Sequence, residues 1–320
     1  MTEILTATVP VELARQRLDA VLVELFPDYS RSRLQQWIKD GRVLINGAVP
    51  RAKDKVEGYE TIQLEVIPEL HDASVQAQNI ELDVVYADAD IIVINKSVNL
   101  VVHPAAGHAD GTMQNALLHY DAALAEVPRA GIVHRLDKDT TGLLVVARNI
   151  KSHKLLVEQL QAREFDREYQ AVVRGVMTAG GTIDEPIGRD PRDRKRMAVR
   201  FDGKESVTHY RVLQRFGHHT HVQVQLETGR THQIRVHLTH KHYPLIGDPV
   251  YGGRLQLPRG ASDALKLCLR GFKRQALHAA RLGLNHPLTG EFLEWKAPLP
   301  DDMQQLLKVL AQEDTPSYDD

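Results

Sequence analysis

From residue 81 onward the chain carries many short β-rich runs in irregular order, with few helical patterns between them. Apolar residues recur at helical spacing in only a few stretches, such as KSHKLLVEQLQ and TMQNALLHY. A doubly wound fold requires strands and helices in regular alternation. The order therefore predicts an α+β fold with a central antiparallel or mixed sheet and flanking helices.

The residues before this region read as a smaller unit. Apolar positions from Leu18 to Leu25 have helical spacing, and Ser32 with Gln35 forms a capping-box signature at the start of a second helix. The Asn46-Gly47 pair predicts a tight hairpin, and alternation in TIQLEV predicts a strand. We therefore expect a compact α/β unit over residues 1–67.

Composition sets the remaining boundaries. Residues 68–80 are polar without periodicity and predict a linker, 81–310 form the main domain, and the acidic stretch 311–320 is expected to be disordered. There is no secretory pattern and no run of about 18 apolar residues. Cys268 is the single cysteine, which excludes an internal disulfide and a thiolate zinc cluster. We expect a cytoplasmic monomer that does not contact a membrane.

The net charge of −2 hides two basic patches, one over residues 31–55 and one over 189–200. Phosphate contacts need only local positive charge. Solvated surfaces explain the same patches equally well. If the first patch binds RNA, a helix over 33–40 would present part of it, and the candidate contacts are Arg31, Arg33, Lys39 and Arg42.

Candidate chemistry concentrates in GIVHRLDKDTTGLLVVAR, residues 131–148. Asp137 and Asp139 loosely match the start of an EF-hand, but Arg148 stands where that loop needs Glu. The string also matches the D-x-D-x-T of haloacid dehalogenase phosphatases, which require a downstream acidic pair; here only Asp248 is available. Histidines crowd into VHLTHKHYP, where packing and hydrogen bonding are expected rather than metal binding, because no H-E-x-x-H pattern is present.

A third interpretation is a resemblance. HRLDKDTTGLLVVAR is similar to the signature of the RluA-type pseudouridine synthases, and REYQAVVRG, LETGRTHQIRVHL, PLIGDPVYGG and QALHAARLGLNHP follow in that family's order. RLDAVL, SRSRLQQWI and GRVLING resemble the S4 RNA-binding domain. The resemblance implies a pseudouridine synthase fold preceded by an S4-like domain. It is strongest to the D type, and it implies action on 23S rRNA or a pre-50S ribosomal particle, at the loop of the intersubunit-bridge helix.

The same resemblance implies site roles. Asp137 would be the catalytic carboxylate, Tyr169 the active-site tyrosine, and Arg230 the arginine that pairs with Asp137. Arg135 would stack in the RNA after the uridine flips out, Leu277 would form an apolar wall of the pocket, and His134 would orient the loop. Pseudouridine formation is redox-neutral, so no cofactor or metal is expected, and no protein partner is inferred. The alternative is a non-catalytic RNA-binding factor for ribosome assembly, which would keep the fold and bind RNA without isomerising uridine.

Overall fold

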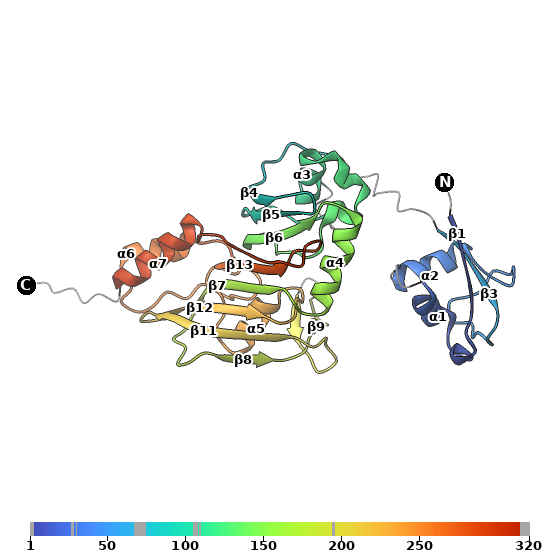
Figure 1. Ribbon diagram of the computed structural model, residues 1–320. Helices are drawn as coiled ribbons and strands as arrows, with labels where there is room; N and C mark the ends of the chain where they lie inside the picture. The colour runs from blue at the N-terminus through green and yellow to red at the C-terminus, as the bar shows by residue number, and fades with distance from the viewer. Residues whose placement is uncertain are drawn as a thin grey trace, which may run out of the picture. The chain divides into compact units, whose positions relative to one another are not determined.

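The chain divides into two compact units, Met1–Leu70 and His71–Asp320, each with its own hydrophobic core (Figure 1). The computed structural model describes residues 3–26, 29, 31–66, 75–104, 108, 110–193 and 196–313. Because the two cores share no residue, each unit is considered by itself.

The N-terminal unit packs two helices against a three-stranded antiparallel sheet in the order β1-β3-β2. Its core joins Leu18 and Leu22 of the first helix with Leu34 of the second and Ile62 and Leu64 of the sheet. The elements are β1 (Glu3–Thr8), η1 (Val11–Leu13), α1 (Leu18–Leu25), α2 (Arg31–Lys39), β2 (Val43–Ile45) and β3 (Thr61–Val66).

Local signals in this unit were mostly correct. The backbones of Ile45 and Ala48 exchange two hydrogen bonds of 2.9 Å around the Asn46-Gly47 turn. Both turn residues have positive φ, +48° and +80°, as this tight turn requires. The expected capping box differs, because the Gln35 amide donates instead to the Asp19 carboxylate at 2.6 Å.

The second unit is built on a nine-stranded mixed sheet in the order β4-β5-β6-β13-β7-β12-β11-β8, with β14 paired to β13 (Figure 1). Its strands are β4 (Val84–Ala87), β5 (Ile91–Lys96), β6 (Thr141–Ala147), β7 (Asp166–Arg174), β8 (Gly181–Asp184), β11 (Val207–Arg215), β12 (His219–Leu226), β13 (Leu277–Asn285) and β14 (Phe292–Lys296). The expected α+β class and the mixed sheet are confirmed.

Strand β13 joins the two halves of this sheet. It runs parallel to β6, where His278 faces Thr141, and antiparallel to β7 along most of its length. Gly142 permits the parallel contact: a Cβ at this position would lie 2.2 Å from the Ala279 carbonyl oxygen, and its φ is +111°. The close approach of β6 and β13 thus requires a glycine at position 142.

The apolar runs of β5 and β6 are buried on both faces. Ile92 and Leu144 belong to the larger core cluster, whereas Ile91 and Leu143 belong to a second cluster across the sheet. Double-sided burial explains why these strands read as continuous apolar runs without alternation.

Helices cover the sheet and a small hairpin stands beside it. Both α6 and α7 contribute to a third core cluster. The hairpin pairs β9 (Ile187–Arg189) with β10 (Met197–Val199). The helical elements are α3 (Met113–Tyr120), η2 (Ala122–Glu126), η3 (Pro128–Gly131), α4 (Ile150–Gln161), α5 (Gln233–His240), α6 (Asp263–Gly271) and α7 (Asp301–Glu313).

Two expected boundaries differ in the structure. The described end of the predicted linker belongs to the second unit, because the Gln78 backbone N–H donates to the Asn115 carbonyl and the Asn115 amide donates to Gln76. At the other end α7 continues to Glu313, into the predicted tail, whose remaining residues lie outside the described part of the chain. Within that described part, no helix is long and apolar enough to cross a bilayer.

Candidate active site

A cavity of about 600 Å³ opens in the second unit beside the loop that precedes β6. Residues from distant parts of the sequence line it, including the ends of β7, β12 and β13 and the start of α5. Every site residue predicted for this unit contributes to its wall: His134, Arg135, Asp137, Tyr169, Arg230 and Leu277.

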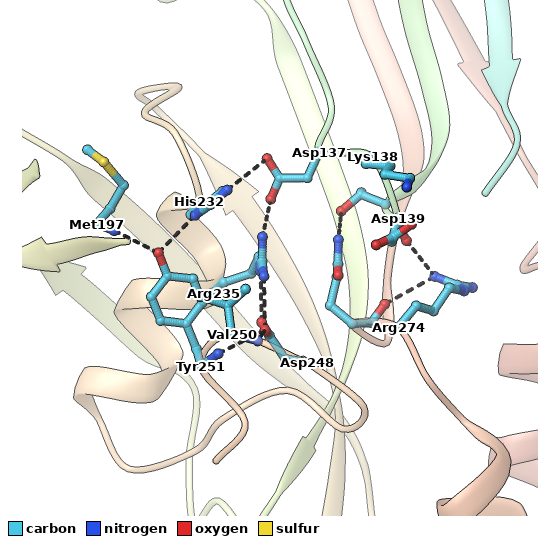
Figure 2. A network of polar contacts seen from close by, with 12 residues as sticks. Asp137, Lys138, Asp139, Met197, His232, Arg235, Asp248, Val250, Tyr251 and Arg274 are labelled. Atoms are coloured by element: carbon cyan, nitrogen blue, oxygen red, sulfur yellow. Dashed lines mark hydrogen bonds and ion pairs between the residues drawn. The ribbon is translucent and has the colours of Figure 1, made fainter. Parts of the chain in front are cut away.

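The loop that carries Asp137 is held through its backbone. The Lys96 ammonium donates to the Lys138 carbonyl at 2.8 Å. Arg274 donates to the Asp139 carbonyl at 3.2 Å (Figure 2). Gln275 donates to the Thr140 hydroxyl at 3.0 Å. Contacts from β5 and from the segment before β13 therefore fix the position of the Asp137 main chain.

Lys96 is almost fully buried, with 1% of its surface exposed. Its ammonium also donates to the carbonyls of Ser97 and Leu100. Burial lowers the pKa of Lys96 to about 7, against the opposing influence of Asp139 and Asp137. Three backbone acceptors satisfy this buried amine, which indicates a structural clamp on the loop.

The Asp137 side chain forms an ion pair with Arg235 of α5. The Arg235 Nη1 donates to Asp137 Oδ2 at 2.8 Å, while its Nε and Nη2 donate to Asp248 at 2.7 and 2.9 Å (Figure 2). Exposed side-chain fractions are 18% for Asp137, 5% for Arg235 and 0% for Asp248. One guanidinium therefore connects a carboxylate at the cavity with a buried one.

Electrostatics favour the charged forms of Arg235 and Asp248. Burial opposes the charge of Arg235, but hydrogen bonds and the charge of Asp248, with Asp137, raise the Arg235 pKa above its ordinary value. Burial likewise opposes ionisation of Asp248, and Arg235 overcomes it, so that the Asp248 pKa lies below its usual range. A permanently charged Arg235 thus stands against Asp137 Oδ2.

The expected partnership of Arg230 with Asp137 is wrong. The Arg230 side chain donates through Nε to the Glu205 carbonyl at 3.0 Å. Arg230 precedes the turn into α5, whereas Arg235 lies within the helix. The motif carried two arginines, and the helix start, which the sequence analysis did not predict, turns the second one toward Asp137.

Tyr169 on β7 and Leu277 on β13 form neighbouring parts of the cavity wall. Both are almost fully buried, and their strands pair so that Tyr169 faces Ala279. Burial raises the pKa of Tyr169, and the negative charge of Asp137 acts in the same direction. The Tyr169 side chain is therefore a neutral phenol at physiological pH.

Arg135 and His134 point to different surroundings. Arg135 is exposed, and its Nη1 lies 3.3 Å from His103 Nε2. His134 Nε2 accepts a hydrogen bond from the Val145 backbone at 3.0 Å, and its ring meets Phe165 edge-on. Burial lowers the pKa of His134 to about 3, so the ring is neutral and anchors the loop to β6.

His232 is a site residue that sequence reasoning missed. Its Nε2 lies 3.8 Å from Asp137 Oδ1, and its Nδ1 lies 2.8 Å from the Tyr251 hydroxyl (Figure 2). The residue takes the left-handed conformation, φ +59°, directly before α5. The available signal was its position in the same motif as both arginines, three residues before Arg235.

The candidate RNA contacts of the N-terminal unit have different environments. Arg31 pairs with Asp19 at 2.9 Å and Arg42 with Glu65 at 3.2 Å. Lys39 is exposed at the end of α2, and the side chain of Arg33 lies outside the described residues. Two of these charges are thus shared with acidic neighbours in the same unit.

The alternative metal and phosphatase sites are occupied by protein contacts. His237 Nδ1 lies 2.8 Å from the Thr208 hydroxyl and its Nε2 lies 2.9 Å from the Glu185 carbonyl. Asp248 accepts from Arg235 and from two backbone N–H groups rather than facing a metal site. These contacts match the expected packing role of the histidine and give Asp248 an ion-pair role.

Comparison with known proteins identifies the class. The RNA pseudouridylate synthase family matches residues 90–240, and the S4 domain matches residues 16–62. Two curated relatives are each 57% identical to this chain. Both are named ribosomal large subunit pseudouridine synthase D, one from Escherichia coli (strain K12) and one from Pseudomonas aeruginosa. The alignments cover 96% of the chain in both cases, with 94% and 96% of the relatives.

A solved structure agrees with this assignment. The human RNA pseudouridylate synthase domain containing 4 protein superposes with a TM-score of 0.59 at 27% identity, covering 71% of this chain and 92% of that one. Sequence, domain order and fold therefore lead to one conclusion: the chain belongs to the RNA pseudouridylate synthase family and carries an S4 domain ahead of its synthase domain.

Proposed function

We propose that this protein converts specific uridines of 23S rRNA to pseudouridine, in the loop of the intersubunit-bridge helix, with Asp137 as the catalytic carboxylate. The observation that carries the proposal is the Asp137–Arg235 ion pair at the wall of the cavity. The names of the bacterial relatives supply the large-subunit substrate.

The reaction exchanges one bond at the ribose for another. The N1–C1′ bond of uridine breaks, the uracil turns, a C5–C1′ bond forms, and the proton on C5 leaves while N1 gains one. No electrons are lost and no cosubstrate is consumed, so the proposal requires no cofactor. Asp137 acts in one of three ways: attack on C1′, attack on C6, or removal of a ribose proton to give a glycal.

The charge on Asp137 is the first requirement of each route. Burial in an apolar pocket disfavours the charged form of a carboxyl group, and a fixed cation nearby favours that form. Arg235 meets this need through Oδ2, which leaves Oδ1 directed toward His232. Tyr169, as a neutral phenol with an aromatic face, is suited to stack on uracil and to relay the C5 proton.

A uridine in folded RNA reaches this cavity only after it leaves the base stack, at a cost of a few kcal/mol. Arg135 is exposed at the cavity, and its planar guanidinium is suited to fill the vacated place. The S4 domain adds phosphate contacts through basic side chains such as Lys39.

The test is position-resolved pseudouridine mapping of unmodified 23S rRNA and of a pre-50S particle. We compare wild type, Asp137→Asn and Asp139→Asn on both substrates, in magnesium that keeps the RNA folded. Asp139 is the matched control, because it lies two residues away and does not line the cavity. The expected result is product in the bridge-helix loop with wild type and Asp139→Asn, and none with Asp137→Asn.

Other outcomes contradict the proposal in different ways. RNA binding without product from the wild-type protein on both substrates indicates a non-catalytic assembly factor. Product at other positions overturns the proposed target while keeping the chemistry. Full activity of Asp137→Asn removes Asp137 from the mechanism.

A further inference from the structure

His232 occupies a strained position whose side chain bridges two groups. Residues other than glycine take the left-handed conformation uncommonly, although histidine, asparagine and aspartate are enriched there, and such residues gather at functional sites. At His232 both imidazole nitrogens face polar partners.

The polar partners of the His232 imidazole favour hydrogen on one of its two nitrogens. The Met197 backbone N–H donates to the Tyr251 hydroxyl oxygen at 2.8 Å. Asp137 as a carboxylate is an acceptor only, so a hydrogen bond to it requires hydrogen on the imidazole nitrogen that faces it, Nε2. With hydrogen there, Nδ1 accepts a hydrogen bond from the Tyr251 hydroxyl, which lies 2.8 Å away. In this arrangement the Met197 N–H, the Tyr251 hydroxyl and the His232 Nε2–H each face one acceptor.

The surroundings keep this imidazole neutral and in place. Burial lowers the pKa of His232, and the positive charge of Arg235 adds to that effect while Asp137 opposes it. Its ring meets the Tyr251 ring edge-on at 5.6 Å, and Arg235 lies 5.0 Å from the centre of the same Tyr251 ring. Tyr251 thus contacts both residues that approach Asp137.

We propose that His232 is a positioning residue that directs its Nε2–H at Oδ1 of Asp137, in a tautomer set by the Tyr251 hydroxyl. Arg235 holds Oδ2 at 2.8 Å, so His232 is the group that orients the second oxygen. The 3.8 Å separation is longer than a hydrogen bond, and the proposal requires it to shorten when substrate enters, as catalytic contacts that are long in the free enzyme often do. The inference rests on the proposed role of Asp137.

The series of hydrogen bonds from His232 through Tyr251 ends at Met197, in an element outside the main sheet. Met197 begins β10 of the β9–β10 hairpin, and Arg196 beside it stacks 5.2 Å from the Tyr251 ring centre. This hairpin carries part of the basic patch over residues 189–200. The orientation of Asp137 Oδ1 is therefore linked, through Tyr251, to the placement of a basic surface element.

The first measurement is the tautomer of His232. Proton–nitrogen NMR of the full-length protein with ¹⁵N-labelled histidine, assigned by the signal lost in His232→Asn, is expected to show hydrogen on Nε2. In Tyr251→Phe the same signal is expected to move toward a mixture of tautomers. Hydrogen on Nδ1 in the wild type overturns the inference, and this readout does not depend on enzyme activity.

The second measurement is single-turnover pseudouridine formation by Tyr251→Phe, His232→Asn and the double variant. We expect a rate about tenfold lower for Tyr251→Phe and about 100-fold lower for His232→Asn, the scale of a misplaced catalytic group. RNA affinity is expected to stay within about twofold, and the double variant to match His232→Asn because both changes break one chain. Asparagine tolerates the left-handed backbone, so the fold is retained.

Tyr210→Phe is the matched control, because Tyr210 is a tyrosine of the same unit that, unlike Tyr251, is not the hydrogen-bond partner of His232. Its rate is expected to equal that of the wild type. Unchanged rates for Tyr251→Phe and His232→Asn overturn the inference. It is also overturned if Tyr251→Phe lowers the rate by the same factor in the wild type and in His232→Asn. If Asp137→Asn remains active, the proposed function fails instead, which separates the two failures.

Discussion

At the scale of single residues, the two arginines of the GRTHQIR motif differ in what holds them. Arg235 is buried between Asp137 and Asp248, whereas Arg230 reaches a backbone carbonyl. Lysine keeps the charge but lacks the planar fork that serves both carboxylates at once. We expect Arg235→Lys to lower the single-turnover rate about 100-fold and Arg230→Lys to change it less than about threefold. A larger loss from Arg230→Lys would restore Arg230 as the catalytic partner.

The sequence identified most of this site but not its ion pair. Asp137, Tyr169 and Leu277 were found by motif, and all line one cavity. The partner was missed because residue spacing does not reveal which arginine of a motif turns inward. That choice depends on the left-handed turn at His232 and on the packing of α5, which are tertiary features.

His134 gives stability a defined dependence on pH. Its pKa is about 3 in the folded state and about 6.5 when unfolded, so below pH 6.5 the unfolded chain binds a proton that the folded chain does not. The contribution of His134 to the unfolding free energy is therefore complete above pH 6.5 and decreases as the pH falls toward 3. From pH 7 to 5 this group costs about 1–2 kcal/mol of unfolding free energy.

The matched variant is His134→Gln, which keeps an acceptor for the Val145 N–H and does not titrate. In urea denaturation its unfolding free energy is expected to fall less than that of the wild type between pH 7 and 5. His221, whose pKa burial lowers to about 4, contributes equally to both proteins and cancels from the comparison. Parallel pH profiles would remove His134 from the effect.

At the scale of elements, the described basic side chains on and just after α2 differ in whether an acidic neighbour holds them. Lys39 is exposed at the end of α2, whereas Arg31 and Arg42 share acidic partners. If Lys39 contacts a phosphate, Lys39→Ala reduces the slope of log affinity against log salt by about 1 and weakens all RNA sequences alike. Lys266→Ala, which removes a half-buried lysine of α6 that pairs with Asp263, is the control, and an unchanged slope in Lys39→Ala excludes this contact.

Elements with a strong local signal were predictable, and those set by distant contacts were not. The Asn46-Gly47 turn and the buried β6 followed from residue type alone. Helix α5 was missed because its sequence carries several β-branched residues and histidines, and its start depends on a strained cap. The β9–β10 hairpin was read only as a charged patch, because its strands are three residues long.

At the scale of the whole molecule, the two separate cores predict two unfolding transitions in calorimetry. Leu22 is fully buried in the N-terminal core and Leu144 in the catalytic core. Leu22→Ala is expected to destabilise the first unit by about 2–5 kcal/mol and to leave the other transition in place. Leu144→Ala should do the reverse, and a single transition that both changes shift would show that the units unfold together.

The sheet order also determines when the active site can form during synthesis of the chain. The strands beside Asp137 and the strands that lead to Arg235 are complete by Leu226, but they are joined only by β13, which ends at Asn285. A ribosome extends the chain at roughly 5–20 residues per second, so β13 follows about 3–12 s later. Until then we expect the two half-sheets to lack the strand that joins them, and the loop of Asp137 to lack its contacts with Arg274 and Gln275. The active site is thus expected to form only after β13 has been synthesised, and a chain truncated before β13 is expected to be inactive.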